Sequence, residues 1–182
     1  MADISSETPP DARKKNKDNV SYWKTNPRCT LIENHLGRTF YAGWKPFAQV
    51  ELDHPLDDEQ DQVYESMVNQ NKRSFFTMPP HVFVWSDELD PLGIPANQIL
   101  TIDPSETITG LKSWQEQLVI FTDRSIYTFT GGAIETFAIH KTVSGIGCVA
   151  QDSIVDVGDA LMFMSNDGIY GFVGHGADGS VV

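Results

Sequence analysis

Short runs of alternating apolar and polar residues, separated by turn-forming residues, fill most of the chain from Tyr22 onward. Cys29-Thr-Leu-Ile-Glu33 and Arg38-Thr-Phe-Tyr-Ala-Gly43 flank Asn34-His-Leu-Gly37, a pattern typical of a β-hairpin. Further short strands are predicted at residues 49–52, 82–87 and 99–102, and residues 108–174 contain a dense series of such runs. The pattern therefore predicts a mainly β protein.

Two segments depart from this pattern. Residues 1–19 are rich in proline, serine and charge, so we expect a flexible N-terminal arm followed by a single β-rich domain over residues 20–182. Residues 57–73 place Tyr64, Met67 and other apolar residues at helical spacing, with acidic residues first and basic residues last, which is the order that the helix dipole favours. One inserted helix or long polar loop is predicted there.

An internal repeat decides the fold class. Residues 118–131 align without gaps with residues 161–174, at an offset of 43 residues. Each copy consists of a four-residue apolar strand, a polar tight turn and a second strand that alternates around Tyr127 or Tyr170. Both faces of each hairpin are apolar, which suits strands stacked between neighbouring sheets. We expect truncation of either tyrosine to alanine to destabilise the fold by roughly 3–5 kcal/mol.

A period of 40–50 residues is typical of β-propeller blades, in which each blade is a four-stranded antiparallel sheet. A sandwich or barrel with two generic hairpins is the alternative. A shorter third copy is suggested by Val84-Trp-Ser-Asp87, 36 residues before Ile120-Phe-Thr-Asp123. Two or three blades leave sheet edges and an apolar face open. Either the copies pack into a compact non-propeller β domain, or other chains complete an incomplete propeller, and we expect the second arrangement.

Composition and charge narrow the function. The formal net charge of −12 argues against sequence-specific binding of nucleic acid, because duplex binding needs a basic face. The basic cluster Arg13, Lys14, Lys15 and Lys17 either contacts an acidic partner or is simply solvated. Residues 1–19 lack the apolar core of a signal peptide and no run is long enough for a membrane helix, so neither secretion nor membrane insertion is expected.

Motifs for catalysis, metal binding or cofactor binding are not recognised in the sequence. The five histidines show no metal-ligand spacing, and Gly145-Ile-Gly147 lacks the third glycine and the helix of a dinucleotide site. Cys148 lies among apolar residues, as a small core residue does. Ser165-Asn-Asp-Gly168 lacks the residue that sialidase-type aspartate boxes place between Asp and Gly. A non-enzymatic protein without cofactors is predicted.

Aromatic residues supply the remaining candidate contacts. Trp85 and Trp114 are candidates for an interface or for stacking on a sugar ring, with Tyr64 and Met67 as further interface candidates. The alternative is that the tryptophans belong to the core within or between blades.

Several short motifs occur in an order that resembles a known family. They are His35-Leu-Gly-Arg-Thr-Phe-Tyr-Ala-Gly43, Val84-Trp-Ser-Asp87 with Asp90-Pro91, Ile108-Thr-Gly-Leu111, Leu118-Val-Ile-Phe-Thr-Asp-Arg-Ser-Ile-Tyr127, Gly147-Cys148 and Asp167-Gly-Ile-Tyr170. Over residues 28–172 the chain resembles structural proteins of tailed bacteriophages, in particular propeller-containing tail nozzle, hub or stabilisation proteins. Relatives of this kind tend to be much longer and to close a full propeller.

The resemblance implies a virion component that is assembled in the host cytoplasm. It would form a symmetric ring of identical subunits around the DNA channel, at the tail or the head-to-tail junction, and contact other tail or head-to-tail proteins. The alternative from a different functional class is a propeller module that binds a glycan or a protein.

Overall fold

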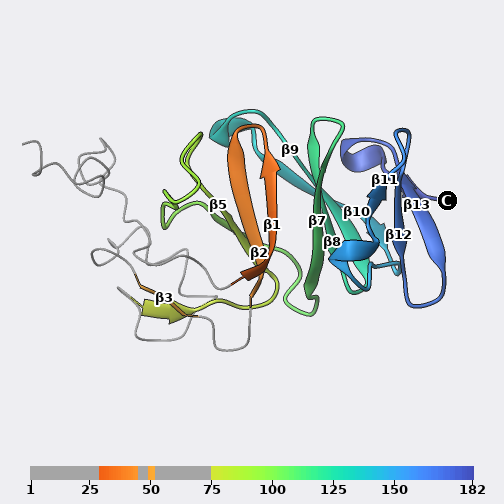
Figure 1. The fold of residues 1–182 in the computed structure, drawn as a ribbon, viewed down its shortest axis with the longest axis horizontal. Helices are drawn as coiled ribbons and strands as arrows, with labels where there is room; N and C mark the ends of the chain where they lie inside the picture. The colour runs from red at the N-terminus through yellow and green to blue at the C-terminus, as the bar shows by residue number, and fades with distance from the viewer. Residues whose placement is uncertain (1–28, 45–48, 52–74) are drawn as a thin grey trace, which may run out of the picture.

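The computed structural model describes residues 29–44, 49–51 and 75–182 (Figure 1). They form three four-stranded antiparallel sheets, which lie side by side in chain order, and a separate two-stranded ribbon. The predicted mainly β, blade-like fold is thereby confirmed, and no closed barrel is present among these residues. The predicted arm at residues 1–19 and the predicted helix or loop at residues 57–73 lie outside the described residues. The extent of the single domain, residues 20–182, stays a prediction.

The first sheet contains four strands in the order β1 (Cys29–His35), β2 (Arg38–Trp44), β5 (Val82–Trp85) and β6 (Ile99–Thr101). Leu36 and Gly37 connect β1 to β2, and both have positive φ angles, of 47° and 75°, as a two-residue hairpin turn requires. Between β2 and β5 in the chain, β3 (Gln49–Glu51) and β4 (Phe75–Thr77) pair antiparallel as the separate ribbon.

The second and third sheets are simple meanders, in which each strand pairs with the next one in the chain. The second sheet contains β7 (Ile108–Trp114), β8 (Gln117–Thr122), β9 (Ser125–Thr130) and β10 (Ala138–Ser144). The third contains β11 (Val155–Asp156), β12 (Leu161–Met164), β13 (Ile169–Val173) and β14 (Ser180–Val181). Four consecutive antiparallel strands are the composition of a propeller blade.

Short 3-10 helices occupy three of the connections: η1 (Ile134–Thr136), η2 (Gln151–Ser153) and η3 (Gly176–Asp178). Across the described ranges, no helix has the length and apolar character that crossing a membrane requires.

The repeat seen in the sequence is a repeat of sheet register. In the β8–β9 hairpin Leu118 lies opposite Phe129, and in the β12–β13 hairpin Leu161 lies opposite Phe172. The remaining pairs of the two hairpins are also related by the same 43-residue offset, for example Ile120 with Tyr127 and Phe163 with Tyr170. The two copies are therefore the second and third strands of two successive sheets.

The shorter third copy is not equivalent to the other two. Val84 and Trp85 belong to β5, the third strand of its sheet, whereas Ile120 and Phe121 belong to β8, the second strand of its sheet. The topological counterpart of β8 in the first sheet is β2. The match between residues 84–87 and 120–123 therefore reflects a similar strand followed by a similar turn, and not the same strand position in the blade.

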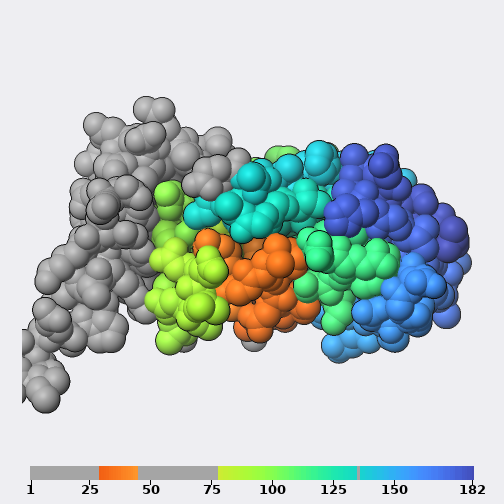
Figure 2. Space-filling view, turned by 90° about the horizontal axis from the view of Figure 1, so that it is seen from above, coloured from red at the N-terminus to blue at the C-terminus, as the bar shows by residue number. Residues whose placement is uncertain are grey.

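Apolar side chains fill both spaces between neighbouring sheets. Strands β8 and β9 alternate, so that Ile120 and Phe129 pack toward the first sheet while Phe121 and Ile126 pack toward the third. Both faces of the second sheet are therefore buried, as the sequence predicted for stacked hairpins. The described molecule extends along the stacking direction, with the third sheet at one end (Figure 2).

The outer face of the first sheet is covered by the protein's own loops. Tyr41, Val84 and Ile99 on this face pack with Met78, Ile94 and Ala96, which lie outside the strands. The loops therefore cover this face apart from Ile32 of β1, which lies beside Tyr41 and is 58% exposed.

Candidate assembly interface

Trp85, one of the predicted contact residues, lies in an aromatic cluster between the first and second sheets. Its ring stacks on Phe40 with a centroid distance of 6.0 Å and meets Phe137 edge-on at 5.7 Å. Only 4% of Trp85 is exposed. In this position the indole joins two sheets, and neither of its faces is presented to a sugar.

Trp114 has the same role at the boundary between the second and third sheets. Its ring meets Phe172 edge-on at 5.9 Å, and its Nε1 donates a hydrogen bond of 3.2 Å to the carbonyl oxygen of Gly158. It too is 4% exposed. The structure thus separates the two tryptophans into different cores. Tyr64 and Met67, the other predicted interface residues, lie outside the described residues.

Polar side chains also fasten the third sheet to the second. The buried Gln117 amide spans the boundary: its Nε2 donates to the carbonyl oxygen of Gly174 at 3.0 Å, and its Oε1 accepts from the amide of Gly176 at 2.8 Å. The Thr128 hydroxyl donates to the carbonyl oxygen of Gly176 at 2.8 Å. Gln151 of η2 makes a similar two-way contact with the backbone of Leu111.

The connection between these two sheets runs against the β8–β9 turn. A Cβ atom built on Gly147 would lie 2.3 Å from the amide nitrogen of Arg124, so only glycine fits there. The next residue, Cys148, is fully buried and donates its amide to the carbonyl oxygen of Thr122 at 2.9 Å. The Gly145-Ile-Gly147 segment therefore serves as a close-packed connection between blades.

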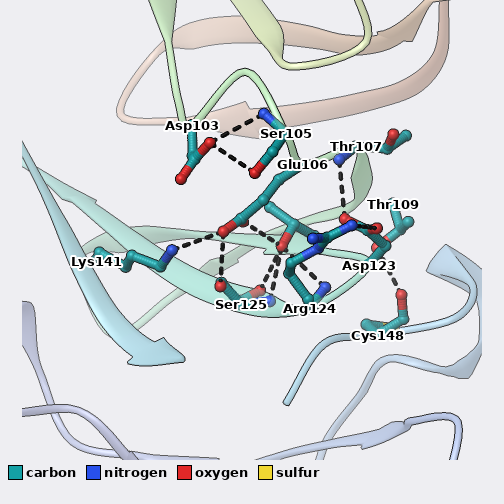
Figure 3. A network of polar contacts seen from close by, with 11 residues as sticks. Asp103, Ser105, Glu106, Thr107, Thr109, Asp123, Arg124, Ser125, Lys141 and Cys148 are labelled. Atoms are coloured by element: carbon teal, nitrogen blue, oxygen red, sulfur yellow. Dashed lines mark hydrogen bonds and ion pairs between the residues drawn. The ribbon is translucent and has the colours of Figure 1, made fainter. Parts of the chain in front are cut away.

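The buried carboxylate of Glu106 accepts hydrogen bonds from several strands of the second sheet (Figure 3). Glu106, in the linker from the first sheet, accepts a hydrogen bond on Oε1 from Lys141 Nζ at 2.6 Å and from Ser125 Oγ at 2.9 Å. Its Oε2 accepts from Thr122 Oγ1 at 2.7 Å. The bond to Glu106 is the main reason that the pKa of Lys141 is raised, and the Lys141 ammonium also lies 5.5 Å from the centroid of the Tyr127 ring.

The geometry of this network is that of a structural clamp. Glu106 contacts residues of β8, β9 and β10 and directly precedes β7, so one side chain ties together the same end of all four strands. Both carboxylate oxygens are already engaged by protein donors. Within the described residues, no group of three or more His, Cys, Asp or Glu side chains is placed to hold a metal ion.

The outer face of the third sheet is apolar and exposed. Met164 is 47% exposed, Ile169 72% and Val155 53%, and they lie on the side of the sheet opposite Phe163 and Phe172. Val182, bonded to Gly171 through both backbone groups, adds a further exposed apolar side chain. We refer to Val155, Met162, Met164, Ile169, Gly171 and Val182 as the open face.

The repeat relates the open face of the third sheet to a buried face of the second sheet. The 43-residue equivalents of Met162, Met164 and Ile169 in the second sheet are Val119, Phe121 and Ile126. All three of these equivalents are fully buried beneath the third sheet. The open face is therefore the position at which a covering layer lies in the preceding repeat.

The segment that contributes the open face carries negative charge only. Residues 142–182 contain five aspartates and neither lysine nor arginine. These aspartates are all exposed: Asp152, Asp156, Asp159, Asp167 and Asp178. The ion pairs formed within the described residues involve other carboxylates. The third sheet and its connections thus combine an exposed apolar face with a net negative charge.

The sequence did not predict the roles of several residues in and between these sheets. Glu106 and Gln117 carry no motif, because their importance depends on which buried donors and acceptors the fold brings to them. The open face did leave a signal, since Met162, Met164 and Ile169 continue the apolar pattern of the first copy of the repeat.

No protein-family model and no curated protein sequence matches this chain.

Proposed function

We propose that this protein is a non-enzymatic structural module of a larger assembly, in which another polypeptide segment covers the open face of the third sheet. The observation that carries the proposal is the equivalence between exposed Met164 and Ile169 and buried Phe121 and Ile126. Exposed apolar surface at a position that is buried in the preceding repeat is the mark of an interface.

The form of the assembly follows from the motif resemblance described above. We propose a symmetric homo-oligomer, a ring around the DNA channel of a tailed bacteriophage, as a tail nozzle, hub or head-to-tail component of the virion. The acidic surface is compatible with a channel wall that does not hold the duplex, because phosphates and aspartates repel one another.

The proposal is supported by the arrangement of the polar groups as well. Glu106, Gln117 and Gln151 use their hydrogen-bonding groups to hold sheets and connections together. Glycan binding through Trp85 or Trp114 is not favoured by any observation, since both indoles are engaged in cores between sheets.

Mass photometry and negative-stain microscopy of the full chain, over a range of protein concentrations, test the proposal. We expect particles of one defined copy number with rotational symmetry. A chain that stays monomeric at all concentrations, and that binds neither itself nor purified tail particles, would overturn it.

A further inference from the structure

We propose that residues 13–28 of one copy bind the open face of the third sheet of a neighbouring copy. In this contact Val20, Tyr22 and Trp23 would cover the open face, and the lysines and arginines of the segment would be attracted by the exposed aspartates of residues 142–182. The inference deepens the proposed assembly function and rests on it, because it names the segment that joins one subunit to the next.

The open face differs in composition from the equivalent face of the second sheet. In the second sheet, Gln117 and Thr128 anchor the following sheet through hydrogen bonds. Their equivalents at the 43-residue offset in the third sheet are Ala160 and Gly171, which have no polar side chain. The open face thus keeps the apolar residues but lacks the anchors for a further blade of the same kind, and a covering segment of another kind fits it better.

Residues 13–28 and the segment that forms the open face carry opposite charge. Residues 13–28 contain six of the thirteen lysines and arginines of the chain and a single aspartate, Asp18. The region of the open face, residues 142–182, contains five exposed aspartates and no lysine or arginine. Pairing two open faces would bring like charges together, whereas docking residues 13–28 brings opposite charges together and buries three apolar side chains.

The distance from β1 to the open face places the contact between copies. Trp23 precedes Cys29, the first residue of β1, by six residues, which span at most about 22 Å. Packed sheets lie about 10 Å apart, so the third sheet is already about 20 Å from the first. The open face lies on its far side and is reached only around a sheet edge. A head-to-tail contact of this kind generates a ring when its rotation closes.

A labelled synthetic peptide of residues 13–28, titrated with the full chain, tests the contact directly. We expect saturable binding by fluorescence anisotropy that weakens as salt is raised. The receptor variant Ile169→Asp should lower affinity at least tenfold, because it places a charge on the open face. The matched control is Ile32→Asp, which should leave binding unchanged. Ile32 lies on β1 of the first sheet and is 58% exposed.

A peptide with Lys14, Lys15 and Lys17 changed to glutamate should lose binding. Equal binding of this peptide and the native one, or equal binding to the Ile169→Asp and Ile32→Asp variants, would overturn the inference. A peptide that fails to bind while the full chain still forms rings would also overturn it, yet would leave the proposed assembly function standing.

Cross-linking in the full chain distinguishes two occupants of the open face: residues 13–28 of a neighbouring copy and the open face of a second copy. One copy carries Trp23→Cys and a differently sized copy carries Ile169→Cys, both with Cys29→Ser. We expect a disulfide between copies of different size. A bond between two copies that both carry Ile169→Cys would instead show face-to-face pairing and contradict the inference. Peptide binding without ring formation would support the contact while counting against the ring.

Discussion

At the scale of single residues, Glu106 has the widest structural effect in the described part of the chain. Its buried carboxylate receives donors from Thr122, Ser125 and Lys141, and so links three strands to the linker that precedes β7. Removal of the carboxylate leaves the Ser125 hydroxyl and the Lys141 ammonium without this acceptor, and leaves the Thr122 hydroxyl the carbonyl oxygen of Ser125 alone. A carboxylate in such a linker gives no sequence signal, because the donors come from residues up to 35 positions away.

We predict that Glu106→Ala lowers the free energy of unfolding by roughly 2–4 kcal/mol, as loss of one partner in a buried, charged network does. Urea denaturation measures the change. Arg124→Ala provides the control, since the Arg124–Asp123 ion pair is exposed and should contribute well under about 1 kcal/mol. Equal effects of the two substitutions would contradict the structural role given to Glu106.

His35 makes the stability depend on pH. Its Nδ1 lies 2.8 Å from Ser113 Oγ in the neighbouring sheet, its Nε2 has no partner within the described residues, and burial lowers the pKa of the imidazole. The unfolded chain therefore binds the proton first as pH falls. The stabilising contribution is complete above the unfolded pKa of about 6.5 and is lost as pH decreases below it.

We predict that the melting temperature falls between pH 7.5 and pH 5.5, and that His35→Gln reduces this fall because glutamine does not titrate. His81, whose pKa is also lowered by burial, leaves part of the fall in place. Thermal melts of both proteins at the two pH values measure the difference. Identical pH dependence in the variant and the native chain would rule out this role for His35.

At the scale of elements, the hairpin repeat was the most informative sequence feature. The alternation around Tyr127 and Tyr170 predicted the strands and the turns of both hairpins, because side chains alternate strictly along a strand, and the structure adds their common register. The short match at Val84 and Trp85 failed, since four residues specify a strand and turn but not which strand of a sheet they belong to.

The two repeat tyrosines differ in environment, which refines the expectation of equal effects. Tyr127 is buried between the first and second sheets, whereas Tyr170 is partly exposed and its hydroxyl donates to Asp167 at the end of the stack. We predict that Tyr127→Ala destabilises by roughly 3–5 kcal/mol and Tyr170→Ala by roughly 1–2 kcal/mol. Chemical denaturation of both variants measures the two losses of unfolding free energy. A larger loss for Tyr170→Ala than for Tyr127→Ala would contradict the partial exposure of Tyr170.

At the scale of the whole molecule, the sequence predicted stacked four-stranded units and an apolar face left open, because the repeat occurs too few times to cover itself. It did not predict which end stays open. That asymmetry depends on Met78, Ile94 and Ala96, loop residues that pack on the first sheet and follow no strand pattern. The sequence likewise did not predict that Trp85 and Trp114 belong to different cores, since their burial depends on how the sheets stack.

We predict that a chain ending at Ser144 loses solubility. Without the third sheet, Val119, Phe121 and Ile126 become exposed, and Gln117 loses its two backbone partners. Centrifugation of the expressed chain and fluorescence of a hydrophobic dye measure the effect. As a comparison, the full chain with Asp178→Asn, changed at an exposed position, should stay soluble. A soluble, monomeric chain of 144 residues that binds no dye would contradict the packing described.

The loops that cover the first sheet also have a consequence for biosynthesis. Since a chain leaves the ribosome N-terminus first, the first sheet can bury its outer face on Met78, Ile94 and Ala96 before the later strands exist. The second sheet then condenses on a surface already in place, and the third on the second. The order of translation thus matches the order in which the three sheets stack on one another.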